Sequence, residues 1–521
     1  MAQRSDRSAS IFSGAAFAFK AFCIALMVGA PLFGVWLASS LAAFANRATW
    51  LPVAAGLLLF PGLPLAWEGI GILRGRRDKK AKGRRRFLTF SDRLILRTLA
   101  LNLLFLVVLL AAYPSRAFVA LSTRGDWMLD GHHGPKAETT RKLLLTLAGA
   151  VEWLYTASHD NPYREGREGQ GDGVDPTPTP TARPIPTASA TPTSPVASTA
   201  PSGTAPSPVA SSSISPVPVP VPDLSPTPPS LPNAYPFPAT LHPAVVSMPK
   251  EVEVSIPSVA KYILAHEPDP LQRVKALHDW VADRIAYDTP NYVAHKVPDA
   301  DRDALAVFRS RVGVCAGYAK LLAELAKVTG DEILYVVGDA RSEEAPMEGE
   351  GHAWNAAHVN GSWYLIDPTW DSGSNDNGTF KKKYGTEYLF TPPDQFAITH
   401  FPDAQKWQLL EHPLSRAEFF RRPVLAPAFF AHGLELRTPD RSQVSVGGSL
   451  DVALGNPRNA FVLGDFTPKH GTGRTECKGN QHTAMHCDFP AAGTYDVRLY
   501  ANDKRYGTYA YAGSVEVNAR P

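Results

Sequence analysis

Three residues that lie far apart in the sequence have the types of a nucleophile, a base and an orienting carboxylate. The segment GHAWNAAHVNGSWYLIDPTW, residues 351–370, contains both His352 and Asp367, and Cys315 lies upstream in RVGVCAGYAK. A thiolate can attack an acyl carbon, an imidazole can shuttle the proton, and a carboxylate can hold the imidazole in the required tautomer and orientation. The residue types therefore predict thiol acyl-transfer chemistry, if the fold brings the three together.

A β-hairpin around Asn360-Gly361 would bring the histidine and the aspartate to one face. Asn-Gly favours a two-residue type I′ turn, which makes the numbers of paired residues sum to 721. Since side chains alternate along a strand, His352 and Asp367 become diagonal cross-strand neighbours on the same face. A one-residue shift would separate them. His358 shares this face but lies near the turn, so His352 is the predicted base.

Cys315 is predicted to begin a helix, with Gly313 and Gly317 on either side. Free N–H groups and the dipole at a helix N-terminus favour a thiolate, and the glycines would let a substrate backbone approach closely. The chain has four cysteines. Cys477 and Cys487 lie in a strand-rich tail and are predicted to form a disulfide in an oxidising compartment. A third lies in an apolar segment, which leaves Cys315 as an unexplained free thiol.

Each of these residues also has an ordinary structural interpretation. A cysteine at a helix start is more often a small buried hydrophobic residue. A histidine in a strand is usually a satisfied polar group, and an aspartate before proline often forms a turn. The three residue types together, with the hairpin register in agreement, favour the catalytic interpretation.

The elements that must position these residues are typical of an α+β core. A helix capped by Asp269, with an apolar stripe at helical spacing, is followed by a shorter helix over residues 304–309. A third helix begins at Cys315 and ends at Gly330. The apolar run EILYVVGDA predicts a buried strand before the hairpin. Helices first and antiparallel strands later indicate α+β architecture. Short alternating strands over residues 431–521 predict a β-sandwich.

Three apolar segments precede this core, at about residues 21–45, 51–73 and 94–119. Each approaches or exceeds the roughly 20 residues that a helix needs to cross a bilayer. The first could pass for a secretory signal, but its length and the two later segments favour an anchor. The run RGRRDKKAKGRRR carries a net +8. The positive-inside rule places this run and the amino terminus in the cytoplasm, and everything after about residue 119 outside.

The charge balance also bears on partners. The whole chain has a formal charge of +3, so removing the +8 of the basic run leaves −5 for the rest. A nucleic-acid binder needs a basic surface on its folded domains, so no nucleic-acid partner is expected.

Five parts are expected along the chain. The Pro/Ser/Thr-rich stretch should be disordered and extended, and should act as a spacer. The helical period of residues 137–156 fits either an interfacial helix or a plain packed one. The parts are a membrane domain with three transmembrane helices (1–120), a juxtamembrane helical segment (121–171), the linker (172–243), an α+β catalytic domain (244–430) and the C-terminal β-sandwich (431–521).

The stretches GVCAGYA, GHAWN and WYLIDPTWD resemble the three core motifs of the transglutaminase-like superfamily, a papain-related fold with a Cys-His-Asp triad. The resemblance implies that Cys315 is the nucleophile, His352 the base and Asp367 the orienting carboxylate. The region after the triad is similar to the kyphoscoliosis peptidase-like branch. The likeness runs from about residue 261 to the end of the chain. Calcium sites known in the family have no recognisable counterpart here, so neither a metal nor another cofactor is expected.

The family resemblance leaves the reaction open. Members cross-link glutamine side chains to amines, hydrolyse peptides, deamidate, or keep the fold without the triad. We expect a membrane-anchored, extracytoplasmic thiol enzyme that acts on protein or peptide amides, with hydrolysis favoured over cross-linking by the branch resemblance. The alternative is a non-catalytic module that binds a cell-envelope component and uses the fold as a scaffold.

Two further features of the site are expected. The backbone N–H of Cys315 is one predicted donor to the oxyanion that acyl transfer creates; the second donor has no assignment. Trp354 and Trp370 flank the triad and, together with Gly313 and Gly317, are assigned to the substrate channel. Core packing accounts for the two tryptophans equally well.

Overall fold

The computed structural model describes residues 2–77, 89–132, 134–158, 161–164, 235–342, 349–376, 378–479 and 482–520. All of these residues belong to one compact unit. Most of the basic run and most of the predicted linker lie outside the described residues.

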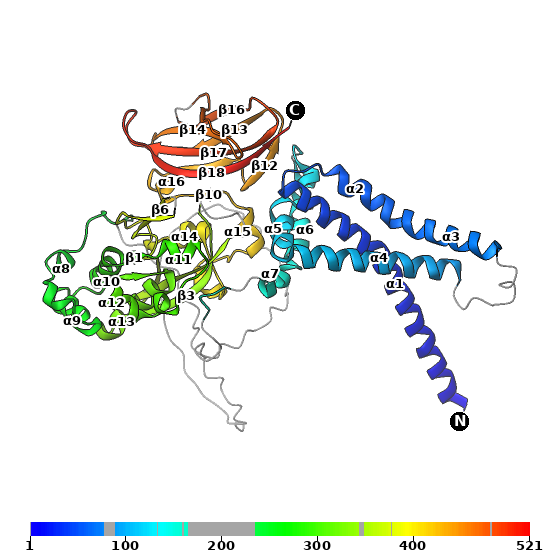
Figure 1. The fold of residues 1–521 in the computed structure, drawn as a ribbon, viewed down its shortest axis with the longest axis horizontal. Helices are drawn as coiled ribbons and strands as arrows, with labels where there is room; N and C mark the ends of the chain where they lie inside the picture. The colour runs from blue at the N-terminus through cyan, green and yellow to red at the C-terminus, as the bar shows by residue number, and fades with distance from the viewer. Residues whose placement is uncertain are drawn as a thin grey trace, which may run out of the picture. The chain divides into compact units, whose positions relative to one another are not determined.

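Three helical stretches near the N-terminus are long and apolar enough to cross a membrane, as the sequence predicts (Figure 1). They are Ile24–Phe44 within α1 (Ala2–Phe44), Trp50–Arg74 across α2 (Trp50–Leu57) and α3 (Leu63–Arg77), and Phe90–Ala112, which is α4. The third stretch ends earlier than expected. Pro114 disfavours helical backbone at Tyr113, which has φ −138° and ψ 56°, and a new helix follows.

The described residues after α4 and up to residue 164, which we call the juxtamembrane segment from here on, form the helices α5 (Pro114–Arg124), α6 (Pro135–Gly149) and α7 (Glu152–Ser158), with a short 3-10 turn at Trp127–Leu129. Tyr155 of α7 packs against Phe420, with ring centroids 5.4 Å apart. Another part of the same segment leaves Leu143, Leu147 and Trp153 exposed. One side of the segment is therefore packed against the protein, and other apolar side chains of the segment are exposed, as an interfacial helix at a membrane surface requires.

The α+β region begins with helices whose ends agree with the predicted signals. Asp269 caps α10 (Pro270–Arg284) by accepting from the backbone N–H of Gln272. Helix α13 (Cys315–Thr329) ends at Gly330, which has φ 80°. Leu321 and Trp280 are fully buried in the core that these helices share with the sheet. The other helices of the region are α8 (Pro243–Val246), α9 (Ile256–His266), α11 (Thr289–Val293), α12 (Ala304–Ser310), α14 (Pro393–Thr399) and α15 (Arg416–Arg421).

The core begins earlier than the predicted domain start at residue 244. Phe237, inside the predicted linker, belongs to the hydrophobic core, and its carbonyl accepts from the Thr386 hydroxyl at 2.6 Å. This stretch, AYPFPATLHP, is aromatic and apolar, unlike the Ser/Thr-rich residues before it. The structure thus gives the folded region an N-terminal extension that packs on the helices.

A five-stranded antiparallel sheet carries the site. Its order is β8-β5-β4-β3-β9, and α13 lies against β3 and β4. Its strands are β3 (Glu332–Ala340), β4 (Glu350–Val359), β5 (Ser362–Ile366), β8 (Leu389–Thr391) and β9 (His400–Pro402). Helices of the core lie together with β3 in the green part of Figure 1. Two small pairs accompany the sheet: β1 (Ala286–Tyr287) with β2 (Val312–Gly313), and β6 (Gly373–Asp376) with β7 (Thr379–Lys382).

The C-terminal region contains the predicted short strands, arranged in a six-stranded and a three-stranded sheet. Buried residues of both sheets form one hydrophobic cluster, and Cys477 and Cys487 form the predicted disulfide. The sandwich arrangement itself stays a prediction. The elements are β10 (Val424–Leu425), α16 (Pro427–Ala431), β11 (Glu435–Thr438), β12 (Gln443–Val446), β13 (Ser449–Gly455), β14 (Phe461–Pro468), β15 (Thr475–Glu476), β16 (Ala484–Asp488), β17 (Gly493–Asn502) and β18 (Ala510–Ala519).

Candidate active site

Cys315 occupies the first position of α13. The preceding residue, Val314, is extended, and its N–H donates to the Asp301 carbonyl at 3.0 Å, which fixes the start of the helix. The backbone N–H of Cys315 therefore belongs to the first helical turn, whose amides lack intrahelical acceptors. Cys315 is a free cysteine and is only 1% exposed.

The glycines on either side of Cys315 have a packing role. A Cβ on Gly313 would lie 2.7 Å from the Val307 side chain, and one on Gly317 would meet the Asp301 carbonyl. Neither glycine lines the cleft described below. Their small size lets α13 approach the preceding loop and α12, which accounts for them without the predicted contact to substrate.

The hairpin has the predicted register. Asn360 and Gly361 have φ values of 51° and 80°, as a type I′ turn requires, and the pairs from Val359–Ser362 to Asn355–Ile366 all sum to 721. Asp367 follows directly after β5. His352 Nε2 lies 2.8 Å from Asp367 Oδ2, and His352 lies close enough to Cys315 for the sulfur to raise the pKa of the imidazole. The structure thus brings the three predicted residues together, with the imidazole between sulfur and carboxylate.

His358 lies outside this group. Its ring stacks on Trp363 at 4.9 Å, and its Nδ1 lies 2.9 Å from the Glu332 carboxylate. Trp370 borders the cleft with its ring 5.5 Å from that of His352. Trp354 is fully buried and packs on Phe396. Of the two tryptophans assigned to the substrate channel, Trp370 alone lines the cleft.

Asp367 is held by four hydrogen-bond donors. Its Oδ1 accepts from the backbone N–H groups of Thr369 at 2.9 Å and Trp370 at 3.4 Å. Its Oδ2 is shared by His352 and by a second imidazole, His400, whose Nε2 lies 3.2 Å away. The carboxylate is therefore fixed from two sides before it orients His352.

His400 is the site residue that sequence reasoning missed. It begins β9, and its ring stacks on Phe396 with centroids 4.0 Å apart. Its Nδ1 lies 2.9 Å from the Thr399 hydroxyl. No spacing rule links it to Asp367, because the contact depends on β9 pairing with β3.

The electrostatics separate the two histidines. Burial opposes a charge on His352, but the Asp367 carboxylate and the Cys315 sulfur raise the pKa of His352 to about 10. Burial lowers the pKa of His400 to about 4 despite the same carboxylate. Burial alone would raise the pKa of Asp367, yet the two histidines hold it well below its usual range. At neutral pH, His352 is thus an imidazolium and His400 a neutral ring.

Neutral His400 can donate from Nε2 to Asp367 only if its Nδ1 accepts, and the Thr399 hydroxyl supplies that proton. In His352, the nitrogen that does not face Asp367 is left for the sulfur. The set therefore forms a chain of contacts from Thr399 through His400, Asp367 and His352 toward Cys315, in which the Asp367 carboxylate accepts from both imidazoles.

His352, Asp367 and His400 also form a group, among the residues that the structure describes, whose nitrogen and oxygen atoms could hold a metal ion. These atoms lie within 4.8 Å of one another. The shared hydrogen bonds to Asp367 already account for this proximity. The expected absence of a metal stays a prediction.

A second buried group supports the loop that follows Asp367. His278 of α10 lies between two carboxylates, with Nε2 3.1 Å from Asp371 and Nδ1 3.0 Å from Asp279. All three side chains are fully buried. Burial opposes the charge, but the two carboxylates raise the pKa of His278 to about 9. A protonated His278 thus ties the triad loop to α10.

A cleft of about 850 Å³ opens beside His352. Its titratable groups other than tyrosines are His295, Glu350 and His352, and the Tyr292 hydroxyl donates to Glu350. The aromatic lining residues are Tyr163, Tyr287, Tyr292, Trp370, Phe380, Tyr388 and Tyr511. Among the described residues that line it, the cleft thus combines aromatic walls with one carboxylate, and none of these residues is a lysine or an arginine.

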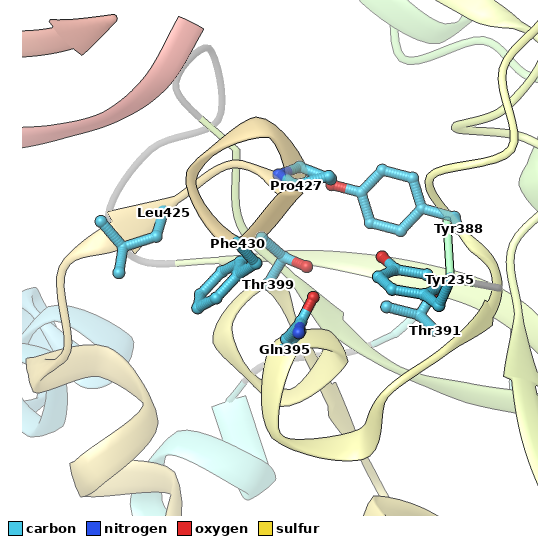
Figure 2. Close-up of a pocket in the computed structure, with 8 residues that line it drawn as sticks. All are labelled: Tyr235, Tyr388, Thr391, Gln395, Thr399, Leu425, Pro427 and Phe430. Atoms are coloured by element: carbon cyan, nitrogen blue, oxygen red, sulfur yellow. The ribbon is translucent and has the colours of Figure 1, made fainter. Parts of the chain in front are cut away.

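A much smaller pocket lies behind Tyr388, where Figure 2 shows Tyr235 and Tyr388 facing Pro427 and Thr399. Its volume is about 10 Å³, enough for about one water molecule. None of its lining residues is a cysteine, histidine or acid, so it has no catalytic group.

Residues 257–368 match the family model of the Transglutaminase-like superfamily, and this range contains Cys315, His352 and Asp367. The chain contains a transglutaminase-like domain. The superfamily resemblance expected from the motifs is thereby confirmed.

The transglutaminase-like domain also has relatives among known proteins. The chain is 28% identical over 242 residues to the Kyphoscoliosis peptidase of Mus musculus and, equally, to that of Homo sapiens; each match covers 44% of this chain and 36% of the relative. It is 23% identical over 181 residues to the Lim and transglutaminase domain protein ltd-1 of Caenorhabditis elegans, covering 31% of this chain and 24% of that protein. The matches support the kyphoscoliosis peptidase-like branch. The chain spans about a third or less of the length of these relatives.

Proposed function

We propose that this protein is a thiol enzyme that transfers or hydrolyses acyl groups of protein or peptide amides through Cys315, His352 and Asp367. The observation that carries the proposal is the order of the three side chains, with the His352 imidazole between the Cys315 sulfur and the Asp367 carboxylate. His352 contacts both the sulfur and a carboxylate that three other groups hold in place. This order is what a nucleophile, a base and an orienting carboxylate require.

The reaction follows from this order. The Cys315 sulfur attacks the amide carbon, and the backbone N–H of Cys315 is the expected donor to the resulting oxyanion. The His352 imidazolium gives its proton to the departing amine, which leaves a thioester on Cys315 and a neutral imidazole. His352 then takes a proton from water or from an incoming amine as that group attacks the thioester. Water yields an acid, and an amine yields a new amide; either step restores the sulfur and the imidazolium.

Hydrolysis is favoured over amine transfer by the relatives, two of which carry the name peptidase. The cleft, about 850 Å³ in volume, is within the usual range for a ligand site. The substrate sequence is left to experiment.

The site is proposed to face the extracytoplasmic side of a membrane. Three helices of spanning length, the basic run between the second and the third, and the Cys477–Cys487 disulfide support this topology. An epitope tag added after residue 521 should be digested when protease is applied to intact cells. A tag that survives until the membrane is broken would overturn the topology.

The reaction can be tested on the full chain in detergent with a protein mixture and a primary-amine probe. Mass spectrometry should find new chain ends for hydrolysis, probe adducts for transfer, or glutamine converted to glutamate for deamidation. Cys315→Ala should abolish the products, while His358→Ala, outside the triad, should keep them. Products that persist in Cys315→Ala would contradict the proposal. If no tested variant forms a product, the non-catalytic scaffold is favoured.

A further inference from the structure

The four residues Asn161 to Arg164, from the juxtamembrane part of the chain, lie against the catalytic sheet. Asn161 is 2% exposed, and its Nδ2 donates to the Gly338 carbonyl of β3 at 2.8 Å. The Tyr335 hydroxyl of the same strand donates to the Tyr163 carbonyl at 2.8 Å. These bonds hold the segment through one side chain and one backbone carbonyl.

The side chain of Tyr163 packs beside the proposed nucleophile. It is 5% exposed, and its hydroxyl lies close enough to Cys315 for the sulfur to raise the pKa of Tyr163. Burial and the neighbouring sulfur raise the pKa of Tyr163 well above its usual range, so the phenol stays protonated and can donate. The ring packs in one apolar cluster with Val314, Cys315, Ala316, Ala319 and Ala353. Tyr163 therefore packs beside the residue whose sulfur a substrate carbonyl carbon must approach.

The sheet leaves room for this segment. Gly351 of β4 has no side chain where the segment passes: a Cβ there would lie 2.8 Å from Asn161 Oδ1 and 3.1 Å from Pro162 Cδ. Beside this gap, the Gly338 carbonyl accepts and the Tyr335 hydroxyl donates. A backbone carbonyl and a hydroxyl beside a side-chain pocket are groups to which a peptide can hydrogen-bond while its side chain fills the pocket.

We propose that this groove, which we call the Tyr163 groove and which is formed by Tyr335, Gly338, Gly351 and the apolar cluster around Cys315, is a substrate subsite for peptides. It takes an aromatic side chain next to the reacting amide, and Tyr163 occupies it in the resting chain. The inference rests on the proposed function of Cys315. Because the occupant belongs to the same chain, a substrate competes with an effective concentration on the order of millimolar. Reaction then requires the segment to leave.

Occupancy can be measured without a substrate, as the rate at which iodoacetamide alkylates the full chain, followed at the peptide that contains Cys315. Tyr163→Ala should raise this rate at least about tenfold, since it removes the group that covers the thiol. The matched control is Tyr506→Ala, on a tyrosine that is 81% exposed, which should keep the parent rate. Equal rates in the parent and in Tyr163→Ala would overturn the inference.

A second variant tests the inference without removing the Tyr163 ring, in case Tyr163→Ala does not fold. Arg164 pairs with Asp403 at 2.7 Å, outside the apolar cluster. Arg164→Glu replaces this attraction by repulsion and leaves the Tyr163 ring intact. It should also speed alkylation, and an unchanged rate would count against a segment held in this way.

Peptide competition tests the chemistry of the groove. In the Tyr163→Ala variant, acetyl-Asn-Pro-Tyr-Arg-amide should slow alkylation of Cys315, whereas acetyl-Asn-Pro-Ala-Arg-amide should not. Equal slowing of alkylation by the two peptides would contradict a subsite for an aromatic side chain.

The two proposals fail in different ways. If Tyr163→Ala is alkylated faster but no substrate gives a product, the proposed function is overturned, while the proposal for the Tyr163 groove stands. If products form but the parent and Tyr163→Ala are alkylated at equal rates, the proposal for the Tyr163 groove is overturned, while the proposed function stands.

Discussion

At the scale of single residues, two imidazoles share one carboxylate in different protonation states. His352 and His400 both contact Asp367 Oδ2, at 2.8 and 3.2 Å. If both were charged they would repel each other, and the opposite pKa shifts of the two rings prevent this. His400 contributes a hydrogen bond that fixes Asp367, and it does so without competing for the negative charge. We therefore treat His400 as a positioning residue.

Replacing His400 should weaken activity through Asp367. A hydrogen bond to a charged group contributes about 1.5–3 kcal/mol, so His400→Leu should lower kcat/KM roughly 10- to 150-fold. His400→Gln can still donate from its amide and should restore much of this loss, which a purely space-filling role would not predict. Steady-state kinetics of the parent, His400→Leu and His400→Gln would distinguish the two roles. Equal losses in Leu and Gln variants would show that His400 acts only by packing.

The predictable part of the site is the part encoded locally. The Asn360-Gly361 turn predicts the register of the hairpin, and this register alone predicts that His352 lies near Asp367. His400 and Tyr163 were not predictable in this way. Each reaches the site through a contact with β3, one by strand pairing and one by hydrogen bonds to Gly338 and Tyr335.

At the scale of elements, the triad loop is fastened to a helix that supplies no catalytic group. Helix α10 was predicted from its cap and its apolar stripe, which explain how it packs. Neither signal shows that the buried His278 joins Asp279 to Asp371. Asp371 in turn accepts from the Tyr388 backbone N–H at 3.0 Å. The fold of this element was therefore predictable from periodicity, while its polar network was not.

Removing His278 should destabilise the protein most at neutral or acidic pH. His278→Leu leaves buried carboxylates without their shared cation, at a cost of about 3–5 kcal/mol, or roughly 6–20 °C in Tm. The folded pKa of about 9 lies above the unfolded value of 6.5. The contribution of His278 to the free energy of unfolding is therefore complete below pH 6.5 and is lost as pH rises through about 9.

Thermal unfolding of the full chain in detergent at pH 6 and pH 10 measures this difference. The gap in Tm between parent and His278→Leu should be large at pH 6 and should shrink at pH 10. The control His412→Leu, at an exposed position, should follow the parent at both. A gap that grows with pH would contradict a protonated His278.

At the scale of the whole molecule, the juxtamembrane helices contact the catalytic and C-terminal regions through buried charges. Asp126 is 2% exposed and pairs with Arg421 at 2.7 Å and with Arg441 at 3.1 Å. Burial would raise the pKa of Asp126, but these arginines lower it to about 2. The helical period of residues 137–156 predicted a helix in this part of the chain, but no pattern predicted the partners of Asp126, because those partners lie about 300 residues away.

Asp126→Asn should loosen this contact. It leaves two arginines without their shared carboxylate, at a cost of about 3 kcal/mol. Hydrogen exchange of α5 (Pro114–Arg124) and α15 (Arg416–Arg421) should then accelerate, whereas Asp299→Asn, at a fully exposed carboxylate, should change nothing. Since the folded pKa of Asp126 lies below its ordinary value, the parent should keep its protection down to about pH 4 and lose it as pH falls toward 2. Unchanged exchange in Asp126→Asn would show that the charges do not hold the helices.

The central claim is that His352 activates the sulfur of Cys315. Its most direct test is the rate at which iodoacetamide alkylates Cys315 at pH 6, in Tyr163→Ala and in Tyr163→Ala with His352→Gln, so that access is equal in both. The imidazolium favours the reactive thiolate, so its removal should slow alkylation at least about tenfold. Equal rates in the two proteins would mean that the imidazole beside the sulfur does not activate it, and the proposed chemistry would fall.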